Sequence, residues 1–266
     1  MSKLTWDDNG QRFYETGVSH GVFYPKTAGG AYTPGVAWNG LTGITESPSG
    51  AEETVLWADN MKYLSLRSAE EYGLTIEAYT YPDEFAACDG HVAFANGVSA
   101  GQQPRKPFGL CYRTELGNDV SYEEYGYILH LVYGITVSPS EKSFQTINDS
   151  PEAITFSWEG TTVPIKVDGL TKPIAELEIR SDCSATGFAS KLATLEAMLY
   201  GADDFDATST YAVGDAVAHE GKLYICKTAI STAAAWDATK WDKISDTTIP
   251  CLPSPEEVKE IFGAVA

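Results

Sequence analysis

Basic residues are scarce in this chain of 266 residues, which has 18 Lys and Arg against 37 Asp and Glu and a formal charge of -19. Proteins that grip nucleic acid need clustered Lys and Arg to neutralise phosphates, so the composition argues against that class. An acidic surface repels DNA, and it also simply keeps a protein soluble. Composition alone favours the second, plainer interpretation.

Cysteines are few and scattered, and long apolar runs are missing. The five cysteines form no C-x-x-C pair, so we expect reduced thiols and neither a disulfide framework nor a zinc site. No stretch approaches the ~20 apolar residues of a membrane-spanning helix. Residues 1–8 lack the apolar core of a signal peptide, so we expect a protein made in a cytosol without a targeting segment.

Catalytic signatures are also missing. The chain has no G-x-S-x-G, no H-E-x-x-H, no P-loop and no G-x-G-x-x-G at a strand-to-helix turn. Adjacent acids such as Glu52 and Glu53 imitate a glycosidase pair, but such neighbours arise by chance among 37 acids. The histidines lie far apart and are interpreted as strand or turn residues: His20, His91, His130 and His219. We therefore expect no enzyme, no metal and no cofactor.

Most of the recognisable patterns in the sequence are typical of β-strands. Twelve per cent aromatic residues with 24 Gly and 13 Pro indicate many short strands and turns. Apolar residues alternate with polar ones over 74–79, 154–159 and 175–180, the pattern of half-buried strands. Residues 125–137 are almost continuously apolar, which predicts a central strand buried on both faces. The predicted fold is mainly β (α+β), a β-barrel or sandwich with short flanking helices.

Three short helices are predicted beside these strands. Apolar residues recur at three- and four-residue steps over 187–200, with Gly201 placed as a C-cap. Residues 82–90 have acids in the first turn and a closing glycine. Near the C-terminus Ser254, Pro255 and Glu257 have the spacing of a capping box with proline at the first helical position.

Several segments together resemble the major tail tube proteins of long-tailed bacteriophages. They are FGLCYRTELGND (108–119), YGYILHLVYG (125–134), PSEK (139–142), INDSPEAITFSWE (147–159), KLATLEAMLYG (191–201) and IPCLPSPEEV (249–258). The resemblance covers most of 1–202 and 246–266, which we interpret as one tail tube domain. It implies a virion protein that forms stacked hexameric rings, with the inner strands of neighbouring subunits joined into one β-barrel.

The resemblance also implies partners. They are other copies of the chain, the tape measure protein inside the tube, the tail terminator and distal tail proteins, and DNA that passes without specific binding. Rings of this family stack through long loops, and 25–38 and 45–57 fit that description. Their candidate ring-stacking anchors are Tyr32, Trp38 and Trp57. The alternative is that these aromatic side chains pack inside their own subunit.

An acidic channel wall would let DNA pass. The candidate lumen residues are acids that alternate outward along predicted strands: Glu77, Glu159, Glu176 and Glu178. The sequence leaves open which face of the sheet meets the channel, and acids on the other face would only be solvated.

Residues 203–245 interrupt the tail tube pattern. The order Tyr-x-x-Gly-Asp-x-Val, Gly-x-x-Tyr and Trp looks like the small chitin-binding type of carbohydrate-binding module. A three-stranded β unit with a hairpin turn at Glu220-Gly221 is predicted. Its aromatic residues are candidates for stacking on host surface glycans: Tyr211, Tyr224, Trp236 and Trp241. The same four side chains alternatively form the core of so small a unit.

Two other classes of function stay open beside the tail tube. One is a glycan-binding adhesin acting through the 203–245 unit, and the other is a glycan hydrolase that carries a binding domain. Electron microscopy of the purified protein separates them, since only a tube protein forms rings.

Overall fold

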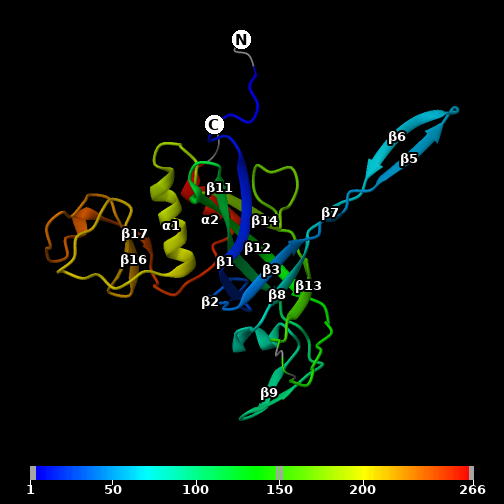
Figure 1. The fold of residues 1–266 in the computed structure, drawn as a ribbon, viewed down its shortest axis with the longest axis horizontal. Helices are drawn as coiled ribbons and strands as arrows, with labels where there is room; N and C mark the ends of the chain where they lie inside the picture. Colours follow the sequence, from blue (N-terminus) through cyan, green and yellow to red (C-terminus); the bar gives the residue numbers. More distant parts are fainter. Residues whose placement is uncertain (1–3, 148, 150–151, 264–266) are drawn as a thin grey trace.

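A computed structural model describes residues 4–147, 149 and 152–263 and shows a mainly β protein (Figure 1), which confirms the predicted fold class. Its largest element is an eight-stranded antiparallel sheet in the order β2-β1-β11-β12-β13-β8-β3, with β14 branching from β12. The strands are β1 (Phe13–Pro25), β2 (Val36–Ala37), β3 (Leu41–Glu46), β8 (Gly73–Ala78), β11 (Phe108–Asn118), β12 (Tyr122–Val137), β13 (Phe156–Thr162) and β14 (Glu176–Arg180).

Strand β12 is the central strand that the apolar run predicted, and residues 128–135 are buried. Near its end Gly134 has φ +65°, and a Cβ there would come within 2.8 Å of the Val163 carbonyl oxygen, so only glycine fits. The strand changes partner at this point. Residues 128–132 pair with β14, and residues 135–137 pair with β13. The sheet therefore divides into two halves that share β11 and β12.

The sheet curls, and the inside of the curl holds the first hydrophobic core. Trp158 lies at its centre against Trp38 and Phe85, with ring centroids 5.8 and 5.1 Å away. Phe85 comes from the 3-10 helix η1 (Asp83–Ala87), which forms where a longer helix over 82–90 was predicted. The curl brings β3 back to β1, because an added Cβ at Gly21 would lie 2.1 Å from Leu41 Cδ1.

Two α-helices cover the opposite face of β1, β11, β12 and β14 and build the second core. They are α1 (Phe188–Tyr200) and α2 (Pro255–Phe262). Buried tyrosines fasten them to the sheet: the Tyr24 hydroxyl donates to Leu199 O (2.7 Å), and the Tyr133 hydroxyl donates to Pro253 O (3.0 Å). Leu192, Leu195 and Leu199 are the buried stripe of α1.

Both helix ends follow the sequence prediction. Gly201 follows α1 with φ +82°, and its N–H donates to Ala197 O (3.0 Å). Ser254 and Glu257 form the complete capping box of α2, with Pro255 at the first helical position.

A hairpin projects far from the sheet (Figure 1). Strands β5 (Glu53–Ala58) and β6 (Met61–Arg67) meet at Asp59-Asn60, two residues with positive φ, as a type I′ turn requires. The ladder of β4 (Ser49–Gly50) and β7 (Glu70–Glu71) connects this hairpin to β3 and β8. We call residues 49–71 the arm. Strands β5 and β6 therefore belong to the arm and not to the main sheet.

Two smaller β units complete the chain. A hairpin of β9 (Val92–Ala95) and β10 (Val98–Ala100) lies near η1. The predicted three-stranded unit consists of β15 (Ala216–His219), β16 (Lys222–Cys226) and β17 (Trp241–Ser245), with the 3-10 helix η2 (Ala238–Lys240) before β17. Glu220 and Gly221 have positive φ and form its hairpin turn, as predicted. We call residues 203–245 the module; it lies beside α1 (Figure 1).

Candidate functional site

The arm exposes a large apolar surface. Leu56 lies opposite Leu64 across the hairpin, and Trp57 and Tyr63 are 70% and 72% exposed. The exposed apolar side chains of the arm are Leu56, Trp57, Met61, Tyr63, Leu64 and Leu66. Soluble monomers rarely leave a surface of this kind uncovered, so it is a candidate contact with another molecule.

Of the three predicted ring-stacking anchors, only Trp57 is on this surface. Tyr32 is buried against Tyr133, with ring centroids 6.0 Å apart. Trp38 is buried in the first core, and its indole N–H donates to Thr80 O (2.9 Å). The prediction is wrong for Tyr32 and Trp38, because both rings are buried within their own chain.

The four acids predicted to line a channel lie on two opposite faces of the sheet. Glu77 and Glu159 are exposed on β8 and β13, on the face away from the first core. Glu176 and Glu178 lie on β14, on the same face as His130 of β12. One continuous wall made of all four is therefore excluded by the register of the strands.

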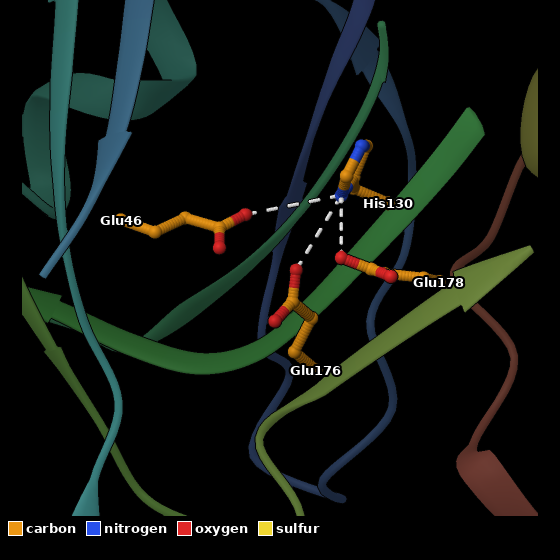
Figure 2. Close-up of side chains that lie close together, drawn as sticks. All are labelled: Glu46, His130, Glu176 and Glu178. Carbon is orange, nitrogen blue, oxygen red and sulfur yellow. Dashed lines mark hydrogen bonds and ion pairs between the residues drawn. The ribbon is translucent and has the colours of Figure 1, made fainter. Parts of the chain in front are cut away.

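Glu176 and Glu178 belong to a cluster of side chains at one end of the first core (Figure 2). His130 of β12 points its Nδ1 atom toward Glu176, Glu46 of β3 and Glu178, whose carboxylate oxygens lie 3.4, 3.8 and 4.0 Å away. The histidine is only 4% exposed. We call Glu46, His130, Glu176 and Glu178 the Glu-His cluster.

Neighbouring side chains hold the His130 ring in place. Tyr112 stacks on it, with centroids 4.5 Å apart and an interplanar angle of 3°. The Tyr112 hydroxyl donates to Glu46 Oε1 (2.9 Å), and Thr114 Oγ1 lies 3.0 Å from His130 Nε2. Desolvation by burial raises the pKa of Glu176, and the nearby His130 opposes that rise.

Sequence reasoning correctly placed His130 in a strand but missed this cluster. Its members come from three strands far apart in the chain, and no local spacing joins position 46 to positions 130 and 176. The only signal was an acid alternating with apolar residues at 176 and 178, which also fits a solvated strand face.

The four aromatic residues of the module meet in its small core. Trp241 is buried, and Tyr211, Tyr224 and Trp236 are partly buried around it. Trp236 stacks on His219 at 3.9 Å and lies 5.2 Å from Trp241. Phe205, which the sequence reasoning had not singled out, packs against Tyr211 and Trp236. The rings thus face one another, as the alternative of a packed core predicted.

The half of the main sheet that the helices cover has two open strand edges. On the half covered by the helices the strand order is β1-β11-β12-β14. Within the residues that the structure describes, β14 pairs only with β12, and β1 meets β2 only at Val22 and Phe23. Residues 13–20 and β14 therefore each present one row of backbone groups with no ladder partner.

Among the described residues, no helix is long and apolar enough to cross a membrane. All five cysteines lie in the described ranges, and none forms a disulfide.

Comparisons with known proteins give little guidance. No known protein family matches the chain, and no curated protein is significantly similar to it. Among solved structures, the chain is similar to one chain of the six-fold symmetrised baseplate of the anti-feeding prophage, with a TM-score of 0.32 and 10% identity. The similarity covers 67% of this chain and 97% of that chain. At these values it identifies neither a family nor a function.

Proposed function

We propose that this chain is a structural subunit of a phage-type tail tube and has no catalytic role. The observation that carries the proposal is the four-stranded segment β1-β11-β12-β14, open at both edges and covered by helices on one face only. If β14 of one copy pairs with β1 of the next, both edges disappear and the segments close into a ring. The sequence resemblance to tail tube proteins supports the same assembly with six copies.

In such a ring the helices lie on the outside, and the channel lies on the opposite side of the segment, next to the first core. Glu176 and Glu178 both lie on that side. Glu178, with 57% of its side chain exposed, keeps its proposed place at the channel wall, whereas Glu176 is mostly buried and Glu77 and Glu159 lie on the other face of the sheet. The channel would hold the tape measure protein during assembly and DNA during ejection. An acidic wall suits DNA transit, because a basic wall would bind phosphates and slow the strand.

The arm supplies a contact along the tube axis. It extends well beyond the sheet (Figure 1). Its exposed apolar side chains suit a docking surface on the next ring. Rings that stack this way would end at the tail terminator on one side and at distal tail proteins on the other. The glycan-binding alternative is weaker, because the module packs the four candidate aromatic rings against one another.

The open edge of β14 gives a sharp test. Ser181 N–H donates to Tyr127 O and Tyr133 N–H donates to Ala175 O, so alternate residues of β14 bond to β12. The N–H groups of Glu176, Glu178 and Arg180 therefore point to the open edge. Proline is tolerated at such an edge but removes one outward donor. Arg180→Pro is expected to keep the monomer folded and to abolish rings, as seen by electron microscopy and mass photometry.

Arg180→Ala is the matched control, because it removes the same side chain and keeps the N–H. It is expected to form rings like the unchanged protein. Normal rings from Arg180→Pro would show that β14 is not the joining edge. A protein that stays monomeric at every concentration, or forms rings of another symmetry, would contradict the tail tube itself.

A further inference from the structure

The Glu-His cluster has an imbalance of charge. Within the described residues, no Lys or Arg nitrogen lies within 4.0 Å of Glu46, Glu176 or Glu178, whereas the nearby Arg180 is engaged by Asp182 at 2.8 Å. Glu176 is mostly buried, with 18% of its side chain exposed. Three carboxylates thus share one histidine nitrogen, and partly buried carboxylates need a cation close by.

His130 is a buried side chain aimed into these carboxylates, and its Nδ1 is within hydrogen-bond distance of Glu176 Oε1 (3.4 Å). Only 5% of its side chain is exposed. Its Nε2 lies 3.0 Å from Thr114 Oγ1 and 3.7 Å from Glu15 Oε1, whereas its Nδ1 faces the three acids of the cluster. A metal-binding histidine typically has this arrangement, with one nitrogen held by a hydrogen bond and the other directed at the ion.

The spacing of the ligand atoms fits a small divalent ion. One ligand atom from each of the four residues lies within 4.8 Å of all the others. The Nδ1-to-oxygen distances of 3.4–4.0 Å are close to the roughly 3.4 Å that separates ligands bound at about 2.1 Å around a tetrahedral ion. Nitrogen and carboxylate ligands together suit zinc, cobalt or manganese better than calcium or magnesium.

The surrounding residues hold the proposed ligands in fixed positions. The ligands stand on β3, β12 and β14, and Tyr112 both stacks on His130 and donates to Glu46. The Tyr72 hydroxyl is buried, and its side chain lines the same hollow as Glu176.

We propose that Glu46, His130, Glu176 and Glu178 bind one divalent transition-metal ion of the zinc class. The ion would offset two of the three carboxylate charges and join β3, at one edge of the curled sheet, to β12 and β14. This inference stands on the monomer alone and does not depend on ring formation.

The test uses the full-length protein freed of metal with a chelator. Titration calorimetry with Zn²⁺ and visible absorption with Co²⁺ are expected to show one ion per chain, and Mg²⁺ is not expected to compete. Zinc is also expected to raise the melting temperature. His130→Gln should abolish binding, and Glu178→Gln, which changes an exposed side chain and leaves folding intact, should weaken it by at least about tenfold.

Two further variants separate a metal site from a general acidic effect. Thr114→Val removes the hydrogen bond to Nε2 and should weaken zinc binding by about 10- to 100-fold, since such supporting contacts have effects of that size. Glu77→Gln removes one exposed acid on the opposite face and should change nothing. Absence of zinc binding in the unchanged protein, or equal binding in Glu178→Gln and the unchanged protein, would overturn the proposal.

Discussion

Asp89 is a charged residue that the chain buries next to its largest aromatic core. It is 4% exposed, accepts a hydrogen bond from the Trp158 indole (3.2 Å) and pairs with Lys142 at 2.6 Å. Lys142 lies after β12 and was part of the PSEK segment noted in the sequence, where nothing indicated a partner. The pair therefore fastens that segment to the end of η1.

Removing Lys142 leaves a buried carboxylate without its main cation. Lys142→Met is expected to lower the free energy of unfolding by about 2–3 kcal/mol, measured by urea denaturation. His91, 3.6 Å from Asp89, limits the loss. The double variant with Asp89→Asn should be more stable than Lys142→Met alone, because no unpaired charge remains. As a control, Lys172→Met at an exposed site should change stability by less than about 0.5 kcal/mol. An equally small loss in Lys142→Met would refute the role of the pair.

Among the secondary-structure elements, the arm packs against little of its own chain and exposes many apolar side chains. Its strands pair mainly with each other, and Trp57 and Tyr63 contact little of their own chain. Whatever covers these side chains is therefore expected to be another subunit.

Replacing both arm aromatics should separate folding from stacking. Trp57→Ser with Tyr63→Ser is expected to leave the melting temperature almost unchanged, because exposed side chains contribute little to the monomer. Single rings should form but not stack into tubes, as judged by electron microscopy. Val213→Ser is the control, because it removes an exposed apolar side chain on the module. It should leave tubes intact. Tubes of normal length from the double variant would exclude the arm as the stacking contact.

The sequence correctly predicted the elements that are determined by residues close together in the chain. The capping box at Ser254, the stripe of leucines in α1 and the apolar run of β12 act within a few residues and appear as predicted. The arm was missed because the Asp59-Asn60 turn was not recognised as a hairpin signal. The Glu-His cluster and the burial of Trp38 depend on the curl of the sheet, which no short segment encodes.

At the scale of the whole molecule, the module is joined to the rest at a single place. A Cβ added to Gly201 would lie 3.5 Å from Pro250 and 3.9 Å from Thr248 O, and Cys251 N–H donates to Met198 O (2.8 Å). The chain thus leaves and returns at neighbouring points beside the end of α1.

Deleting residues 204–246 and closing the gap with a short Gly-Ser linker is expected to leave the main sheet folded and able to form rings. The reason is that the module has its own core of aromatic residues and contributes no strand to the main sheet. Circular dichroism, thermal melting and electron microscopy of the shortened chain provide the measurements. An unfolded product would mean that α1 needs the module to stay in place.

The adjacency of Gly201 and Thr248 also has a consequence for how such a chain changes over generations. A DNA segment encoding any compact unit with neighbouring ends can enter or leave the gene here without altering a hydrogen bond of the main sheet. The module can therefore be exchanged by recombination while the surfaces proposed to join subunits are inherited unchanged. For the same reason, this junction is the natural place to graft a foreign domain for display.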